Sequence, residues 1–205
     1  MLDLNLILSL SQACAPQAAP ETLAAVAWTE SRFNPLAIGV NRGPRPPRAP
    51  RTAAEAARIA RGLLARGADL DLGLAQINSA NLAWLGLSVE AAFDPCRNLA
   101  AAGTVLRAGY RPGPGADPQT ALRVALSRYN TGHPRRGFGN GYVARVERAA
   151  RDLGLARPAP VRASDPPPAI MLRAELRAPE WDVFARAATS PQLAFRAPHN
   201  PGDLP

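Results

Sequence analysis

The sequence predicts a mainly α-helical domain with one small β-hairpin or extended element, followed by a proline-rich tail. Apolar residues recur at spacings of three and four in several segments, which is the pattern of helices with one buried face. Only one short segment alternates apolar and polar residues with a period of two. Ten of the 22 prolines lie in residues 156–205, and this density excludes a continuous helix or central strand there. We therefore expect a domain over residues 1–154 and a largely disordered tail over residues 155–205.

Residues 1–15 are expected to form the first helix of the domain. The segment is apolar, but no arginine precedes it, and Asp3 stands where an export signal carries positive charge. As an export signal the segment is therefore poorly marked. No apolar stretch of the chain approaches the roughly 18 to 20 residues that a membrane-spanning helix needs, so we expect no transmembrane span.

The helix expected after Pro20 places one acid on an apolar stripe. At offsets of zero, three, four and seven, one face of this helix carries Leu23, Val26, Ala27 and Glu30. Glu30 also lies in the last turn, because Pro35 disfavours helical geometry just before it. Burial and the negative end of the helix dipole both oppose ionisation, so one interpretation is a carboxyl group with a raised pKa, as a catalytic proton donor needs. The alternative is an ion pair at the rim of the stripe with Arg32 or another arginine.

The next segments predict an insertion, a helix and an extended element. The insertion is residues 42–51, in which an arginine stands at every third position. It could form a polyproline helix with one charged edge, but we favour a solvated loop kept open by self-repulsion. Thr52 and Glu55 form a capping box for a helix that Gly67 closes. The extended element is the run that alternates with period two, at Leu70, Leu72 and Leu74.

Three further helices are expected before residue 154. Asp94 and Asp117, each followed by proline, can cap the first two, and the second should end before Gly132. Asn140 can cap the last one. Each of these segments carries an apolar stripe at helical spacing.

The charge of the chain suits an anionic polymer. The chain has 24 basic residues, all arginine, against 16 acidic ones, which gives a net charge of +8. Charge alone does not separate nucleic acid, cell wall and acidic lipid as partners. We expect no nucleic-acid partner, because the arginines are scattered and only 5% of the residues are aromatic, which leaves few rings to stack on bases.

The chain contains two cysteines, Cys14 and Cys96. Two are too few for a disulfide scaffold or a zinc cage, and the two histidines show no partner pattern, so we expect no metal site. The residues alone leave two alternatives open. The cysteines form one disulfide in an oxidising compartment, or they are buried reduced thiols that act as small apolar groups.

Four short motifs resemble those of the lysozyme-like lytic transglycosylases. In chain order they are Glu-Ser-Arg-Phe-Asn-Pro at 30–35, Asp-Leu-Gly-Leu-Ala-Gln-Ile-Asn-Ser at 71–79, Tyr-Asn-Thr-Gly at 129–132 and Asn-Gly-Tyr-Val at 140–143. Four motifs in the expected order make the resemblance specific. The insertion, the Phe-Asp-Pro-Cys segment at 93–96 and the tail look most like the transglycosylase component of type IV secretion and conjugation systems. The resemblance implies a lysozyme-like α+β fold of mostly helical content.

The resemblance also implies a peptidoglycan lytic transglycosylase that needs no cofactor, with Glu30 as its single catalytic acid and base. Such an enzyme cleaves the bond between N-acetylmuramic acid (MurNAc) and N-acetylglucosamine (GlcNAc). It leaves anhydromuramoyl ends, because the primary hydroxyl of the same MurNAc replaces water. The residues that the resemblance assigns to the substrate are Asp71, Gly73, Gln76, Asn78, Tyr129 and Asn130.

Several of these positions have an expected role. The amides of Gln76 and Asn78 suit sugar hydroxyls and acetamides, since an amide both donates and accepts. Gly73 would let the glycan approach the backbone. The Tyr129 ring would pack while its hydroxyl reaches toward the catalytic acid or the sugar. Asn130 would shape the loop beside it.

Two departures from the family pattern leave alternatives open. If Asp71 reached the anomeric carbon opposite Glu30, the protein would be a hydrolytic muramidase of the retaining kind. Ala75 stands where the family usually has methionine, which we expect to remove bulk from the wall of the cleft. A further alternative is a glycan-binding scaffold without catalysis, which resembles the enzyme in fold alone.

A peptidoglycan substrate implies a place in the periplasm or cell envelope. Disulfides persist there, so the resemblance favours a bridge between Cys14 and Cys96. The expected partners are peptidoglycan strands and envelope proteins of a secretion system. The tail would contact those proteins, and residues 169–190, which regain apolar content, are its candidate docking segment.

Overall fold

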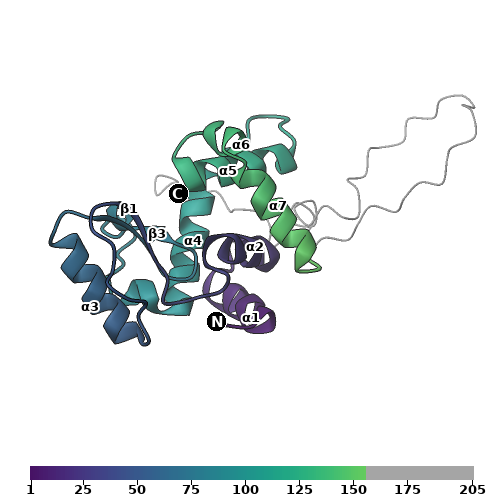
Figure 1. The fold of residues 1–205 in the computed structure, drawn as a ribbon. Helices are drawn as coiled ribbons and strands as arrows, with labels where there is room; N and C mark the ends of the chain where they lie inside the picture. Colours follow the sequence, from purple (N-terminus) through teal and green to yellow (C-terminus); the bar gives the residue numbers. More distant parts are fainter. Residues whose placement is uncertain (156–205) are drawn as a thin grey trace, which may run out of the picture.

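The computed structural model describes residues 1–155 (Figure 1). Within them the fold is mainly α, with one small antiparallel sheet, which confirms the predicted fold class. The expected tail over residues 155–205, with its docking segment at 169–190, lies outside the described residues except for its first position. The expected domain boundary therefore stays a prediction.

The described residues form seven α-helices and three strands. The helices are α1 Leu4–Cys14, α2 Pro20–Ser31, α3 Ala53–Leu64, α4 Pro95–Gly109, α5 Pro118–Thr131, α6 Arg136–Gly139 and α7 Tyr142–Asp152. The strands are β1 Ile38–Arg42, β2 Asp69–Leu72 and β3 Ile77–Asn78. Short 3-10 turns span Ser79–Asn81 and Ala91–Phe93. The sheet order is β1-β2-β3, and both pairs are antiparallel.

Local capping fixes most of the helix limits. The side chain of Asp3 accepts from the third residue of α1, and Asp94 and Asp117 cap α4 and α5 in the same way. Thr52 accepts from the Glu55 amide at the start of α3. These contacts satisfy amide groups that the first turn of a helix leaves without a partner. The helices expected at these positions are therefore confirmed.

The ends of two helices show finer detail. Gly67, with φ of 73°, ends the turn after α3, and the next amide donates to the carbonyl of Leu63, which is a Schellman motif. Helix α7 begins one residue later than expected, since Gly141 is its N-terminal flanking residue. The side chain of Asn140 nevertheless accepts from the Tyr142 amide, at 3.0 Å.

Strand β1 and the short helix α6 were not predicted. The residues of β1 are half-buried or exposed and do not alternate between core and solvent, so no period of two marks the strand. Its pairing with β2 includes an irregularity between Val40 and Arg42. The rest of the 42–51 insertion is irregular and mostly exposed, as expected of a solvated loop. Arg48 in this loop forms an ion pair with Glu55 of α3.

Helix α2 lies between the sheet and the C-terminal helices (Figure 1). Six consecutive residues of α2, 22–27, are buried, because α1, α4 and α7 all contact the helix. Six consecutive residues point to all sides of a helix, so their burial makes α2 a core helix. A surface helix would bury only one apolar stripe. Its C-terminal end faces the sheet, and the candidate site lies there.

A disulfide joins Cys14 at the end of α1 to Cys96 at the start of α4. The two residues are 82 positions apart in the chain. The bond therefore ties the N-terminal helix to the helix that carries the buried Asn98.

Replacing Cys14 and Cys96 together by alanine should lower the free energy of unfolding by up to about 4 to 5 kcal/mol. The reason is that the disulfide joins residues 82 positions apart and so lowers the conformational entropy of the unfolded chain. Urea unfolding of the oxidised protein, the reduced protein and the double variant measures the difference. The reduced protein and the variant should unfold at similar urea concentrations, and equal midpoints for all three would contradict the prediction.

Candidate active site

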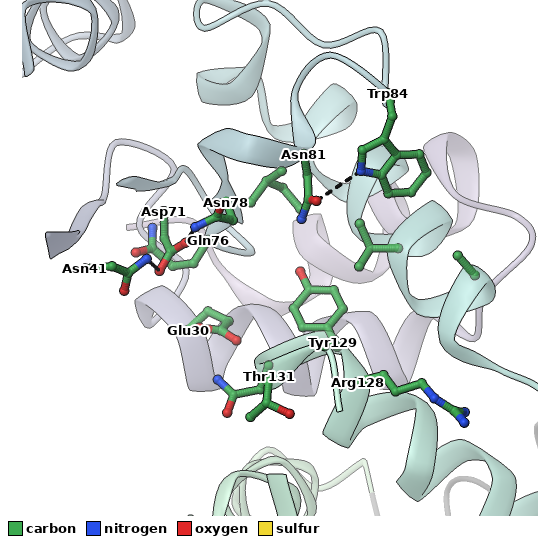
Figure 2. A pocket seen from close by; sticks show the side chains of 15 residues that line it. Glu30, Asn41, Asp71, Gln76, Asn78, Asn81, Trp84, Arg128, Tyr129 and Thr131 are labelled. Carbon is green, nitrogen blue, oxygen red and sulfur yellow. Dashed lines mark hydrogen bonds between the residues drawn. The ribbon is translucent and has the colours of Figure 1, made fainter. Parts of the chain in front are cut away.

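A cavity of about 510 Å³ lies between the C-terminal end of α2, the sheet and the facing ends of α4 and α5 (Figure 2). It brings together six of the seven residues that the sequence assigned to catalysis or substrate, which are Glu30, Asp71, Gln76, Asn78, Tyr129 and Asn130. Gly73 is not part of the lining. The lining also contains residues that the sequence did not point to, chiefly Asn41, Asn81, Trp84 and Arg128.

Glu30 lies in the last full turn of α2, where the chain reverses sharply. The next residue, Ser31, donates its hydroxyl to the carbonyl of Leu74 at 2.6 Å, which joins the helix to the loop after β2. Arg32 and Phe33 then adopt left-handed φ angles of 55° and 62°. Two consecutive non-glycine residues in this region carry backbone strain, so the end of α2 is held in place by its surroundings.

The alternative of an ion pair with Arg32 is not realised. The Arg32 guanidinium lies over the Trp28 ring, 4.8 Å from its centre. No ion pair found within residues 1–155 includes Glu30. The carboxyl group therefore lines the cavity without a direct basic partner from the described part of the chain.

The pKa of Glu30 is raised from 4.5 to about 7. Burial is the largest cause, since it disfavours the charged form, and the nearby Asp71 carboxylate adds to it. A hydrogen bond from Tyr142 and the positive charge of Arg145 act in the opposite direction. The raised pKa follows the direction that the place of Glu30 on the helix predicts, and at neutral pH about half of the molecules hold the proton.

The hydroxyl group that bonds to Glu30 is that of Tyr142. The expectation that the Tyr129 hydroxyl reaches Glu30 is wrong. Tyr142 donates to Oε1 of Glu30 at 2.6 Å, whereas the Tyr129 hydroxyl donates to the carbonyl of Ala75 at 2.7 Å. Tyr142 is almost wholly buried and Tyr129 is half-buried against the core, and burial raises the pKa of each well above its usual value. Tyr142 lies four residues before Val146 on the buried face of α7. This helical spacing predicts that the Tyr142 side chain points into the core.

Asp71 is held in the cavity by two side-chain amides. Its Oδ2 accepts from Asn41 of β1 and its Oδ1 accepts from Asn78 of β3, each at 2.9 Å. Burial raises the pKa of Asp71, while these hydrogen bonds lower it. Because the amides come from both neighbouring strands, the sheet fixes the position of this carboxyl group.

Asn78 therefore supports acidic groups more than it offers an amide to a sugar. Its Nδ2 donates to Asp71 and also to Oδ1 of Asp69 at 2.8 Å. Its Oδ1 accepts from the amide of Ala80 and caps the 3-10 turn that follows. Both ends of the Asn78 amide are occupied within the protein.

The turn between β2 and β3 is held by Gln76 and by the buried Asn98. Gln76, with φ of 50°, donates its side-chain amide to the carbonyl of Gly73 at 2.8 Å. Asn98 accepts from the amide of Ala75 and donates to the carbonyls of Leu72 and Ala92. These contacts satisfy the polar backbone of a turn that packs against α4.

This packing gives Gly73 a structural role and places Ala75 away from the wall of the cavity. Gly73 has φ of 74°, and a Cβ there would collide with the Ala92 carbonyl and the Asn98 amide. The turn and its close contact with Ala92 and Asn98 therefore require glycine at this position. The expected approach of the glycan to Gly73 stays a prediction. Ala75 is fully buried, so it fills the core beneath the turn and does not form a wall of the cavity.

The other end of the cavity is formed by α5 and the turn after β3. Trp84 is 53% exposed, and its indole N–H donates to Asn81 at 3.0 Å. Arg128 and Asn130 come from α5, and Asn130 accepts from the side chain of Asn140, which supports its expected role in shaping the local loop. The described part of the chain contains no group of three or more His, Cys, Asp or Glu residues that could hold a metal ion. No helix within residues 1–155 is sufficiently long and apolar to cross a membrane.

The chain is similar to known proteins over most of this domain. It is 43% identical to Protein virB1 of Agrobacterium fabrum over 146 residues, which cover 71% of this chain and 59% of that protein. It is 44% identical to the type IV secretion system protein virB1 of Brucella abortus over 135 residues, which cover 64% of this chain and 56% of that protein. The chain thus spans less than two thirds of the length of these relatives. No solved structure matches it significantly.

The family comparison extends over both the helices and the sheet. Residues 8–150 match the transglycosylase SLT domain, and this segment includes every side chain that lines the cavity. The chain therefore belongs to the transglycosylase SLT domain family, which confirms the resemblance that its four motifs indicate.

Proposed function

We propose that the protein is a lytic transglycosylase of peptidoglycan, with Glu30 as its catalytic acid and base. One observation carries the proposal, namely the half-buried carboxyl group of Glu30, which lines the cavity, has its pKa raised to about 7 and forms no ion pair within residues 1–155. A group that is half protonated at neutral pH can donate a proton and later take one back. The family supports this choice of chemistry.

The proposed reaction has two proton transfers. Protonated Glu30 gives its proton to the glycosidic oxygen between MurNAc and GlcNAc, the bond to the anomeric carbon breaks, and GlcNAc leaves as an alcohol. The acetamido group of MurNAc stabilises the electron-poor anomeric carbon. The Glu30 carboxylate then takes the proton of the primary hydroxyl of the same MurNAc, whose oxygen bonds to the anomeric carbon. The product is an anhydro ring, water is not consumed, and Glu30 is again protonated.

The pKa of Glu30 decides whether this cycle starts in the correct state. At the ordinary value of 4.5, about one glutamate in 300 holds a proton at pH 7, and at about 7 one in two does. The shift corresponds to about 3 kcal/mol, which is small beside the roughly 8 to 23 kcal/mol by which enzymes lower barriers. Burial of one side chain is therefore sufficient to prepare the acid.

A second candidate function rests on Asp71. This carboxyl group lines the same cavity as Glu30 and is fixed by Asn41 and Asn78. If it attacks or stabilises the anomeric carbon from the opposite side, water completes the reaction and the protein is a retaining muramidase. We place the transglycosylase first because of the family, and both reactions use Glu30 as the acid.

The cellular role proposed here is local opening of the cell wall for a type IV secretion or conjugation apparatus. The relatives from Brucella carry type IV secretion in their names, and a peptidoglycan substrate would place the protein in the periplasm or envelope. The disulfide between Cys14 and Cys96 suits such an oxidising compartment. Contact with envelope proteins of the apparatus through residues 155–205, with 169–190 as docking segment, belongs to the same proposal.

Glu30→Gln should lower the rate of peptidoglycan cleavage by about 100- to 10,000-fold, because the amide has no proton to give. Purified cell wall is digested with both proteins, and mass spectrometry identifies the released ends. The control is Glu21→Gln, which changes an acid in the first turn of the same helix, outside the cavity.

The ends distinguish the candidate functions. Anhydromuramoyl ends support the transglycosylase, and reducing ends indicate the muramidase that uses Asp71. Equal turnover by the wild type and Glu30→Gln would end the assignment of Glu30. Failure of the wild type to release any product would favour a glycan-binding scaffold.

Glu30→Gln should also stabilise the protein more at pH 8 than at pH 4. In the wild type the folded state keeps a proton that the unfolded chain releases between pH 4.5 and about 7, so stability falls as the pH rises through this window. The variant lacks this loss. The difference in free energy of unfolding between variant and wild type should grow by about 3 kcal/mol from pH 4 to pH 8. Urea unfolding at several pH values measures it, and a difference that is constant with pH would contradict the raised pKa.

Tyr142→Phe should move the alkaline limb of the activity profile to higher pH. The Tyr142 hydroxyl stabilises the charged form of Glu30, so its removal raises the pKa of the acid further, by about one pH unit. The pH profile of kcat/KM measures the shift, and a merely structural effect would lower the rate without moving the limb. In Tyr129→Phe the limb should stay in place, since that hydroxyl bonds Ala75.

A further inference from the structure

The end of the cavity away from Glu30 carries a cation that has no acidic partner within residues 1–155. Arg128 of α5 lines the cavity, and its Nη1 donates to the carbonyl of Gly109, the last residue of α4, at 2.8 Å. None of the ion pairs between residues 1 and 155 includes Arg128. A guanidinium has five N–H donors in a planar fork, so the bond to Gly109 orients the group and leaves other donors for a ligand.

An exposed aromatic ring lies at the same end. Trp84 keeps 53% of its surface exposed although it lines the cavity, and the hydrogen bond from its indole N–H to Asn81 fixes the ring. Figure 2 shows Trp84 and Arg128 on the side of the cavity opposite Glu30 and Asp71. A fixed and exposed indole offers an apolar face for the C–H groups of a sugar.

The two ends of the cavity therefore differ in charge. Glu30 and Asp71 stand at one end and Arg128 at the other. A neutral sugar gains little from a cation, whereas a sugar that carries a carboxylate gains a charge-assisted hydrogen bond. In the proposed substrate only MurNAc bears such a group, because its lactyl ether ends in a carboxyl. In strands with peptides that carboxyl is amide-linked, and the peptide stem supplies other carboxylates.

We propose that Arg128 binds a carboxylate of the glycan strand and so selects strands that contain MurNAc over neutral polymers of GlcNAc. Trp84, which lines the same side of the cavity, holds a sugar ring of the strand. This inference rests on the proposed function, because it names the part of the same substrate that the far end of the cavity recognises. A partly buried arginine that is already oriented loses little freedom on binding, so we expect a preference of about 10- to 100-fold.

The test measures binding in the Glu30→Gln protein, which should hold glycans without cutting them. The ligands are a GlcNAc tetrasaccharide, a peptide-free tetrasaccharide of alternating GlcNAc and MurNAc with free lactyl carboxyls, and the same tetrasaccharide with these carboxyls converted to amides. Calorimetry gives Kd for each. The free acid should bind at least about tenfold more tightly than its amide, and added salt should reduce this ratio.

Variants assign the preference to one side chain. Arg128→Ala should reduce the ratio of the two Kd values to about one, and Arg128→Lys should restore part of it. Arg111→Ala is the matched control, since Arg111 also donates to a carbonyl at the end of α4, that of Ala108, but is not part of the cavity lining. The ratio should survive in this control. Trp84→Ala should weaken all three ligands alike.

A fourth ligand, a strand whose MurNAc carries the peptide stem, identifies the source of the carboxylate. If Arg128→Ala weakens binding of the peptide-free acid alone, the carboxylate is that of the lactyl group. If it weakens binding of the peptide-bearing strand, the carboxylate is that of the stem. Either result supports the proposal. Equal Kd values for the acid, the amide and the peptide-bearing strand would overturn it, and this outcome needs no variant of Arg128 to fold. Failure of the proposed function would appear separately, as a wild type that leaves peptidoglycan intact or a Glu30→Gln protein that cuts it.

Discussion

The burial of one carboxyl group is the constraint on which the site depends. Glu30 stands at the end of α2, a helix covered by α1, α4 and α7, so its side chain has lost most of its water. A hydrogen bond from the Tyr142 hydroxyl partly replaces this lost hydration. No ion pair among the described residues includes Glu30. A stronger partner would stabilise the carboxylate and lower its pKa. The weak compensation therefore keeps a proton on the side chain near neutral pH.

The strands of the sheet line the cavity opposite Glu30, and the helices hold the turn that joins β2 to β3. Ser31 of α2, Asn98 of α4 and Tyr129 of α5 each bond to the backbone of this turn. A buried turn needs such partners, because an unpaired backbone group in the core costs about 1 to 3 kcal/mol. The same three contacts join the sheet to the helices, so the structure that satisfies the turn also shapes the site.

The amides of the site act mainly within the protein. Asn41 and Asn78 hold Asp71. The side-chain N–H of Gln76 donates to the carbonyl of Gly73 and so stabilises the turn. Under the proposed function, recognition of the substrate then falls to groups with free hydrogen-bonding capacity or exposed surface, chiefly Arg128 and Trp84. The hydrogen bonds fix the acidic end of the cavity, and such fixed geometry would suit the proposed catalysis.

The sequence by itself determined the limits of most helices and the place of Glu30, the proposed acid. Caps such as Asp94 and Asp117 act within three residues of the chain, and Glu30 shares the helical spacing of the buried Leu23, Val26 and Ala27, so both can be read locally. Tertiary structure alone decided which hydroxyl bonds Glu30. Tyr142 is 112 positions away, and only the packing of α7 on α2 selects it over Tyr129. Tertiary structure likewise decided strand β1, which forms by backbone hydrogen bonds to β2. Its residues are half-buried or exposed without alternation, so the sequence shows no period of two there.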